Sequence, residues 1–334
     1  MTSATPRDAA APPLLEVRGL KTHFFTEEGV VQAVDGVDLE LRRGETLGLV
    51  GESGSGKSVT SLSIMRLIAY PGRIVEGSVH FDGRDLAGLD DEAMRQIRGN
   101  RISMVFQQPT TCLNPVFRVG EQIIEALQIH RSLTREAAHV RCRELMALVG
   151  LPDPERRMAQ YPHELSGGQC QRVMIAMALA CDPELLIADE PTTALDVTIQ
   201  AQILDLMRGL REQIQTAIIL ITHDLGVVAE MADRIAVMYA GQIVETADVR
   251  TLFRDPQHPY TQGLLASIPM PGDVRDELAA IPGTVPSLIS PPVGCRFADR
   301  CARRMPRCDE APPMISLAAD RKVRCWLHDA AHEH

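Results

Sequence analysis

Residues 51–58, which read Gly-Glu-Ser-Gly-Ser-Gly-Lys-Ser, have the spacing of a loop that binds phosphate groups. Glycines let backbone N–H groups turn inward around an anion. Lys57 is expected to contact the terminal phosphates, and the Ser58 hydroxyl is expected to ligate Mg²⁺. We therefore predict a site for a nucleoside polyphosphate and Mg²⁺. The residues assigned to this phosphate loop are Gly51, Ser53, Gly54, Ser55, Gly56, Lys57 and Ser58.

Two adjacent carboxylates form a second candidate for chemistry. The apolar residues 185–188 lead directly into Asp189 and Glu190. Open α/β sheets bind ligands at the C-terminal ends of their strands, where this pair is expected to lie. Asp189 is assigned to the Mg²⁺ shell, and Glu190 to orienting and deprotonating an attacking water. Two carboxylates are needed because a metal-bound carboxylate is a poor base.

The elements that must position these residues can be read from the apolar pattern. Residues 46–50 are typical of a buried strand, and a helix is expected over 58–68. Later apolar runs alternate with helical patterns, which indicates an α/β layer with parallel strands. Residues 117–181 show apolar residues at helical spacing, so a helical insertion is expected. The later strands are predicted at 102–106, 185–188, 217–221 and 234–238.

Composition narrows the possible functions. The chain has 334 residues, a net charge of −10 and only 4% aromatic residues. This balance argues against nucleic acid as a partner. No apolar stretch reaches the roughly 18–20 residues of a membrane span, and no signal segment is evident, so a cytosolic protein is expected. Residues 1–13 are rich in Ala and Pro and are predicted to be disordered.

A third motif makes a family resemblance specific. Residues 165–169 read Leu-Ser-Gly-Gly-Gln, and together with the phosphate loop and Asp189-Glu190 they resemble the signature sequence of ABC-transporter ATPases. The resemblance covers about residues 14–250. It implies an α/β P-loop NTPase fold, in which a RecA-like core carries an antiparallel β subdomain and a helical signature subdomain at about 108–183. The further family positions matched here are Gln107, the stretch 194–196 ending in Asp196, His223, and the adenine-stacking Phe24, with Phe25 as a second choice.

The resemblance implies how the site works. ATP and Mg²⁺ lie on the phosphate loop of one subunit, with Ser58, Gln107 and Asp189 around the metal. A second subunit contributes its signature motif to the γ-phosphate. His223 holds the γ-phosphate and keeps Glu190 in register. Two positions depart from the usual family pattern, Cys170 and Gln108. The signature residues carried over are Ser166, Gly167, Gly168 and Gln169.

The C-terminal part, residues 251–334, has a different texture. Eleven of the 22 prolines lie between Pro256 and Pro313, so a loop-rich extension is expected. Its sequence is similar to the C-terminal extension of ATPase subunits in dipeptide and oligopeptide ABC importers, a branch that includes nickel importers. Some relatives bind an iron–sulfur cluster there, and the matching positions are Cys295, Cys301, Cys308 and Cys325.

The residues around these cysteines favour a thiolate site. Eight basic and four acidic residues between 295 and 325 give a charge of +4, which favours thiolates. Four thiolates suit either a [4Fe–4S] cluster or zinc. The intervals of five, six and sixteen residues lack the tight pair usual in structural zinc sites, which favours iron–sulfur. Zinc, and thiols without a ligand or in disulfides, remain the alternatives.

The leading hypothesis is an ATPase subunit that powers peptide import. It implies two membrane permease subunits, a second ATPase subunit that forms a heterodimer, an extracytoplasmic substrate-binding protein, and a place on the cytoplasmic face of the membrane. One alternative is a soluble ABC ATPase of DNA repair or translation, and another is an iron–sulfur redox sensor. Nickel or haem in place of peptide is also left open.

Overall fold

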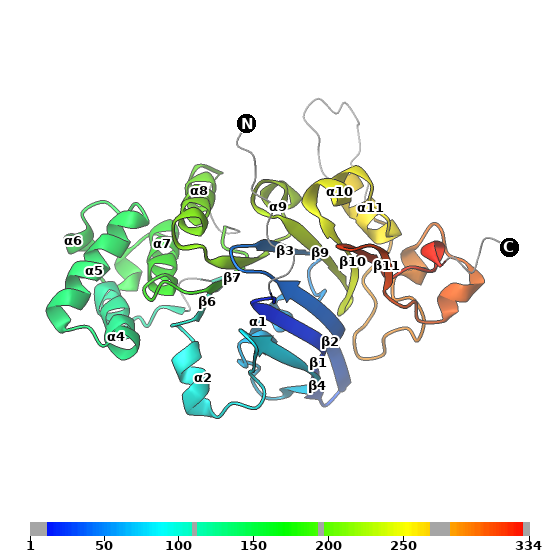
Figure 1. Ribbon diagram of the computed structural model, residues 1–334, viewed down its shortest axis with the longest axis horizontal. Coiled ribbons are helices and arrows are strands. Elements are labelled where there is room, and N and C mark those ends of the chain that lie inside the picture. Colours follow the sequence, from blue (N-terminus) through cyan, green and yellow to red (C-terminus); the bar gives the residue numbers. More distant parts are fainter. Residues whose placement is uncertain (1–11, 109–111, 193–196, 268–280, 330–334) are drawn as a thin grey trace.

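The computed structural model describes residues 12–108, 112–192, 197–267 and 281–329. Two sheets organise these residues, and both lie between a helical subdomain at one end and the C-terminal extension at the other (Figure 1). The larger sheet carries the expected parallel strands. Across this sheet the strands run in the order β11 (Ile315–Ala318), β12 (Arg321–Val323), β10 (Gln242–Asp248), β9 (Arg234–Tyr239), β3 (Thr46–Val50), β8 (Ala217–Ile221), β7 (Leu185–Asp189) and β6 (Ile102–Val105).

Strands β9, β3, β8, β7 and β6 are parallel to one another, as predicted from their alternation with helices. Every residue of β3, β7 and β8 is buried, because helices pack on one face of this sheet and the smaller sheet, together with the helix after the phosphate loop, packs on the other. The helices that accompany these strands are α1 (Lys57–Ile64), α8 (Val197–Ile214) and α9 (Leu225–Met231).

The smaller sheet is antiparallel and forms the predicted β subdomain. Its strands follow the order β2 (Gly29–Leu41), β1 (Leu15–Thr26), β4 (Gly72–Phe81) and β5 (Arg84–Asp85). The turn at Asp82-Gly83 joins β4 to β5, and both turn residues have positive φ. Short helix α2 (Asp91–Ile97) follows and connects this subdomain to β6.

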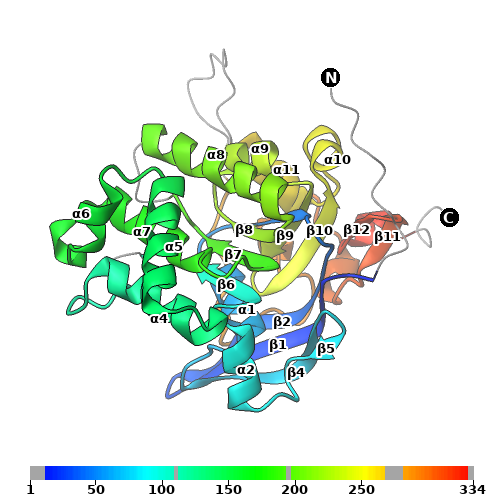
Figure 2. The same cartoon turned by 60° about the vertical axis from the view of Figure 1, so that its left-hand side comes forward.

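The helical subdomain is inserted between β6 and β7 and stands to one side of the parallel strands (Figure 2). Its apolar residues share one core with helices of the main sheet, so it is packed rather than hinged loosely. Its helices are α4 (Val119–Arg131), α5 (Arg135–Leu148), α6 (Pro154–Met158) and α7 (Gly167–Ala178).

The C-terminal extension is more ordered than its proline content suggested. It begins within α10 (Val249–Arg254), continues as α11 (Pro259–Ala266) and ends in the β11–β12 hairpin. Strand β12 pairs with β10, so the extension lengthens the main sheet. A buried carboxylate anchors its start, because Glu245 accepts backbone N–H bonds from Gln257 and His258, both at 2.8 Å. Residues 281–314 contain no α-helix or strand, which agrees with the predicted loop-rich extension, and the pairing of β12 with β10 is a feature that the sequence did not predict.

Candidate active site

The phosphate loop connects β3 to α1, as the sequence predicted. Close packing explains two of its glycines. A Cβ at Gly51 would lie 2.1 Å from the carbonyl oxygen of Met238, and a Cβ at Gly56 would lie 2.3 Å from that of Ala33. Gly56 also has φ of +105° at the N-cap of α1. Any side chain at these two positions would push the loop away from the strands beneath it.

Lys57 lies inside the loop. Its side-chain ammonium donates to the carbonyl oxygens of Gly51 at 2.8 Å and Glu52 at 3.0 Å, and to the Ser55 hydroxyl at 3.4 Å. Burial lowers the pKa of Lys57, while the nearby carboxylates of Glu190 and Asp189 act to raise it. The ammonium is thus held where it faces both the loop and the carboxylate pair.

Asp189, the last residue of β7, is buried with 5% of its surface exposed. Burial raises its pKa, and a hydrogen bond from the Ser58 side chain opposes that shift. Within the described residues, its Oδ1 atom is buried without a hydrogen-bond partner. Carboxylate and hydroxyl oxygens are the ligands that Mg²⁺ prefers. Asp189 and Ser58 therefore fit a Mg²⁺ site by both chemistry and unmet bonding capacity.

Three predicted catalytic residues meet at the ends of adjacent strands. Gln107 follows β6, Glu190 follows β7 and His223 follows β8. The Gln107 side chain donates to Glu190 Oε2 at 2.8 Å, and His223 Nδ1 lies 3.4 Å from Glu190 Oε1. Neighbouring parallel strands bring these side chains to one edge of the sheet. Glu190 is thereby held from both sides.

The backbone of Glu190 is unusual. Its φ is +46°, a left-handed conformation that is uncommon for a residue other than glycine, and its N–H donates to the carbonyl of Ile221 at 2.8 Å. Such strained positions cluster at functional sites. The chain turns at the end of β7, so the carboxylate of Asp189 is buried in the strand end while that of Glu190 contacts Gln107 and His223.

The signature residues lie in a different place. Ser166 is the N-cap of α7, where its hydroxyl accepts from Gln169 N at 3.3 Å while the Gln169 side chain accepts from Ser166 N at 3.1 Å. Ser166 and Gly167 are exposed. The motif residues 166–169 line a cavity of about 530 Å³ that includes none of the phosphate-loop residues. Asp196, another residue that the family resemblance singled out, lies outside the described residues.

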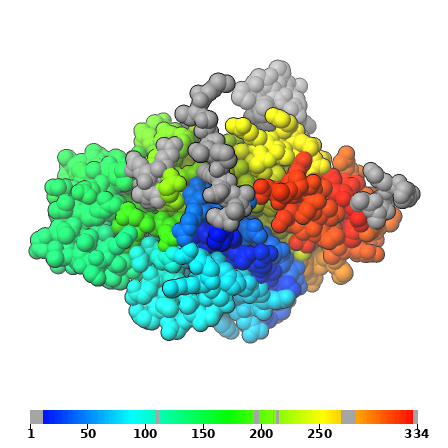
Figure 3. Space-filling view, in the orientation of Figure 1, coloured from blue at the N-terminus to red at the C-terminus, as the bar shows by residue number. Residues whose placement is uncertain are grey.

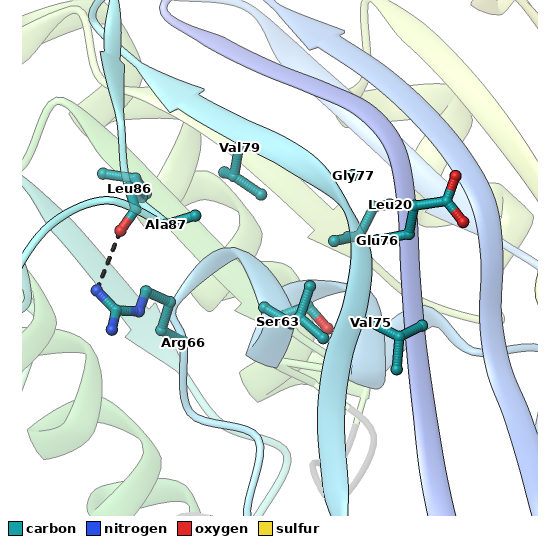
Figure 4. Close-up of a pocket in the computed structure, with 10 residues that line it drawn as sticks. Leu20, Ser63, Arg66, Val75, Glu76, Gly77, Val79, Leu86 and Ala87 are labelled. Carbon is teal, nitrogen blue, oxygen red and sulfur yellow. Dashed lines mark hydrogen bonds between the residues drawn. The ribbon is translucent and has the colours of Figure 1, made fainter.

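A mainly apolar cavity of about 310 Å³ lies elsewhere, between β4 and the end of α1 (Figure 4). Ser63 and Arg66 reach it from the helix side, and Val75 and Val79 from the strand side. None of the motif residues lines this cavity. The chemistry predicted from the sequence is therefore placed at the strand ends and not in this hollow.

The two aromatic candidates for adenine stacking have different surroundings. Phe24 is half-buried, and its ring lies so close to Gly72 that a Cβ there would be 2.6 Å from it. Phe25 is 38% exposed, with the guanidinium of Arg73 at 4.2 Å from its ring centre. The packing leaves more of the Phe25 ring available than of the Phe24 ring.

The four clustered cysteines line one cavity of about 10 Å³, together with Phe297 and Trp326. Burial raises the pKa of Cys295 to about 11 and also raises the pKa values of the Cys301 and Cys325 thiols. Desolvation is the largest cause of each shift, and the charge of Arg303 opposes it at Cys301 and Cys325, so the expectation that positive charge would favour thiolates is wrong for these three thiols. In the part of the chain that the structure describes, no group of three or more His, Cys, Asp or Glu is placed to hold a metal ion. The donors suit a thiolate site by type, but as placed they do not form one for iron–sulfur or zinc.

Sequence reasoning missed several contacts of the motif residues. Gln171, buried on α7, donates to the carbonyl of Pro191 at 2.7 Å and so links the signature helix to the residue after Glu190. A polar residue on the apolar side of that helix was the available signal. Cys170, noted as a departure, is fully buried, and its thiol donates to the Pro162 carbonyl at 3.4 Å. The extension residues Tyr260 and Arg300 contact Glu52 of the phosphate loop. No spacing in the sequence predicted these contacts.

Within the described residues, no helix combines the length and hydropathy that crossing a bilayer requires. The chain matches the family model described as ABC transporter at residues 34–193, and that described as oligopeptide/dipeptide transporter, C-terminal region, at residues 244–308.

Three Bacillus subtilis (strain 168) proteins resemble most of the chain. The oligopeptide transport ATP-binding protein AppD is 53% identical and spans 95% of this chain and 97% of its own length. For OppD, also described as an oligopeptide transport ATP-binding protein, the values are 56%, 94% and 88%. The dipeptide transport ATP-binding protein DppD is 52% identical over 96% of both chains.

Solved structures of ATP-binding cassettes are similar to this chain. The ATP-binding cassette MJ0796, solved as a dimer in a post-hydrolysis state with ADP and phosphate, has a TM-score of 0.65 and 31% identity and covers 71% of this chain and 99% of its own. A transporter cassette from Clostridium perfringens, cbiO1, has a TM-score of 0.61 and 25% identity over 73% of this chain and 92% of its own. The fold, the ordered motifs and these relatives together show that the chain belongs to the ATP-binding subunits of oligopeptide and dipeptide ABC transporters and is an ATPase of that family.

Proposed function

We propose that this chain hydrolyses ATP to power the import of di- and oligopeptides through a membrane transporter. The observation that carries the catalytic part is the set of side chains around Glu190, which accepts from Gln107 at 2.8 Å and lies 3.4 Å from His223. Glu190 is assigned as the base that orients and deprotonates water. His223 holds the γ-phosphate and the position of Glu190. Positioning and charge stabilisation dominate phosphoryl transfer, so contacts that hold Glu190 in place support this assignment.

The metal and phosphates are assigned to the neighbouring residues. Ser58, Asp189 and Gln107 would hold Mg²⁺, which when bound neutralises charge on the phosphates. The unpartnered Oδ1 of Asp189 supports this assignment. Lys57 is assigned to the terminal phosphates, where it would exchange its loop carbonyl partners for phosphate oxygens. Phe24 is retained as the adenine-stacking residue, with Phe25 as the matched alternative.

The complete site is proposed to form between two subunits. Ser166, Gly167, Gly168 and Gln169 line a cavity separate from the phosphate loop, and the exposed N-terminus of α7 suits an anion from elsewhere. The relative MJ0796 was solved as a dimer with ADP and phosphate. We propose the same arrangement here, with a related second ATPase as the partner.

Transport requires further chains. The proposed assembly places this subunit on the cytoplasmic face of the membrane against two permease subunits, and an extracytoplasmic binding protein delivers the substrate. The division into a cassette at residues 14–250 and an extension at 251–334 belongs to the same proposal. The relatives described above are named for oligopeptide or dipeptide transport, which favours peptides over nickel or haem and over a role in DNA repair or translation.

The cargo is tested by uptake. In cells that lack this chain, uptake of labelled di- and oligopeptides is expected to fall, and the wild-type chain but not Lys57→Ala should restore it. Nickel and haem uptake in the same cells should not change. Loss of nickel or haem uptake with normal peptide uptake would contradict the proposed cargo.

From the type of the four cysteine donors, and not from their present arrangement, we propose an iron–sulfur cluster with a structural role, and zinc is the competing ligand. A cavity of about 10 Å³ holds no more than about one water, so the thiols must separate to admit a cluster. The test is anaerobic purification followed by analysis of iron, sulfide and zinc. An absorption spectrum near about 400 nm, where iron–thiolate clusters absorb, completes it. A colourless, iron-free and zinc-free preparation would leave ordinary buried thiols as the answer.

A further inference from the structure

The phosphate loop is held from outside at Glu52, and every polar group of this residue has a partner. Its N–H donates to the Tyr260 hydroxyl at 2.8 Å. Its carbonyl accepts from the Lys57 ammonium at 3.0 Å and from Ser55 N at 3.2 Å. Its carboxylate accepts from the Arg300 guanidinium at 2.9 Å. Two of these partners, Tyr260 and Arg300, belong to the C-terminal extension.

Tyr260 is fixed before it meets the loop. The side chain is fully buried in the first turn of α11, and its ring packs on Tyr239 at 4.5 Å and on Phe297 at 5.4 Å between ring centres. Burial raises the pKa of its phenol, so the hydroxyl stays protonated at any working pH. The oxygen that accepts the Glu52 N–H is therefore placed by the packing of the extension.

Arg300 is fixed in the same way. Only 6% of its side chain is exposed, and its other nitrogens donate to the carbonyls of Pro282 at 2.9 Å and Ile281 at 3.3 Å. Its guanidinium also lies 5.7 Å from the ring centre of Tyr239. A planar guanidinium bonded at several nitrogens has little freedom left, so it presents a fixed donor to the Glu52 carboxylate.

A second attachment supports the other side of the loop. Arg296 donates to the carbonyl of Ala240 and to Asp35, both at 2.5 Å. Gly241, which follows Ala240 in the chain, donates its N–H to the Ser55 carbonyl at 2.8 Å. In the space-filling view, the later residues of the extension (orange to red) lie beside the first strands (blue) and beside helices α10 and α11 (yellow) (Figure 3). The extension thus reaches the loop from two directions.

We propose that Tyr260 and Arg300 are positioning residues of the ATPase site. They hold Glu52, and through its carbonyl Lys57, in the loop conformation that receives the phosphates. The C-terminal extension thereby sets the affinity for nucleotide. This inference rests on the proposed assignment of residues 51–58 as the phosphate loop.

Preorganisation explains the direction of the effect. A loop that is already ordered loses little entropy when a ligand binds, so weakening its supports lowers affinity without changing the reacting groups. A single neutral hydrogen bond changes an equilibrium constant by roughly three- to tenfold. Arg300 additionally balances the carboxylate of Glu52, which would otherwise repel a polyphosphate.

Tyr260→Phe isolates the positioning effect because it removes only the hydroxyl. ATP binding is measured on the full chain, and steady-state hydrolysis on the assembled transporter. The expected result is a rise in Kd and KM of roughly three- to tenfold, with kcat within about twofold and an unchanged melting temperature. Tyr70→Phe, at a residue that is 97% exposed, is the matched control and should have no effect. An unchanged KM, or a fall in kcat that follows a fall in melting temperature, would overturn the proposal.

A double-mutant cycle tests the ion pair. Glu52→Gln alone removes a negative charge near the phosphates, so coupling between the two sites is the informative quantity. Arg300→Met should raise Kd for ATP roughly three- to tenfold in the wild-type background and have little effect in the Glu52→Gln background. Arg300→Lys should recover part of the affinity. Equal effects of Arg300→Met in both backgrounds would contradict the proposal.

Two controls keep the outcomes distinct. Arg304→Met is matched to Arg300→Met, because Arg304 lies in the same segment but pairs with the exposed Asp299 and Asp309, and it should leave Kd unchanged. Lys57→Ala should abolish ATP binding if residues 51–58 are the phosphate loop. If Lys57→Ala fails to do so, the site assignment is at fault. If it abolishes binding while Tyr260→Phe and Arg300→Met change nothing, only the positioning role is overturned.

Discussion

At the scale of single residues, Glu190 and Asp189 have different environments, which suit the two tasks that we propose for them. Glu190 is turned by a positive φ and is contacted by Gln107 and His223. Asp189 is buried in the strand end, with one oxygen that has no hydrogen-bond partner among the described residues. Adjacent positions in the chain thus acquire different surroundings, which is what a water-activating base and a metal ligand need.

Removing the base is expected to stop turnover while retaining nucleotide. Glu190→Gln can still accept a hydrogen bond from Gln107 but cannot take a proton, so kcat should fall about a hundred- to ten-thousandfold. ATP should persist in the variant and stabilise a dimer in gel filtration. Glu230→Gln, at an exposed glutamate that pairs with Arg208, is the control. Rapid turnover by Glu190→Gln would falsify its role as the base.

The charged form of Asp189 is expected to lower the stability of the unliganded fold. Its pKa is raised by burial, so the folded chain binds a proton more readily than the unfolded chain, and the unliganded fold becomes more stable as the pH falls toward that pKa. At neutral pH the charged form therefore costs stability. Asp189→Asn should raise the melting temperature without ligand and abolish the further rise that Mg²⁺ adds in the presence of ATP. A lower melting temperature without ligand would contradict this account.

At the scale of elements, helix α11 is the part of the extension that carries Tyr260, and its N-cap is a histidine. His258 Nδ1 accepts from the N–H of Tyr260 at 3.0 Å, and its own N–H is held by Glu245. Burial lowers the pKa of His258 from 6.5 to about 3. A protonated ring could not accept at Nδ1, so acid would break the cap that orients Tyr260 toward the phosphate loop.

The sign of the resulting pH dependence follows from linkage. Between these two pKa values the unfolded chain binds the proton and the folded chain does not, so stability is lost as the pH falls below 6.5. The loss approaches about 1.4 kcal/mol per pH unit. Denaturant unfolding at pH 7 and pH 5 should show a smaller loss in His258→Asn, which caps without titrating. His139→Asn, at an exposed histidine, should behave like the wild type.

At the scale of the whole molecule, the extension and the cassette share their interior. One apolar cluster joins Val50 of β3 to Tyr260, Phe297 and Cys301 of the extension. The β11–β12 hairpin continues the main sheet through β10, and Arg321 pairs with Asp255 across its edge at 2.9 Å. Shared packing of this kind favours unfolding as one unit.

The single tryptophan makes this testable. Trp326 lies against the cysteine cavity, and its indole donates to the Glu310 carbonyl at 3.0 Å, so its fluorescence reports on the extension. Circular dichroism reports mainly on the cassette. The two unfolding curves are expected to coincide in denaturant. An earlier fluorescence transition would show that the extension unfolds separately and could not hold the phosphate loop in the way proposed.

The sequence by itself determined the ordered motifs, the parallel strands that carry them and the family, because phosphate loops and strand-end carboxylates depend on local residue order. Only the tertiary structure decided which side chains surround Glu190, that burial raises the pKa of Cys295, and that Tyr260 and Arg300 bind Glu52. Tyr260 and Arg300 each lie more than 200 positions after Glu52 in the chain. Their distances and desolvation come from packing, which no local pattern encodes.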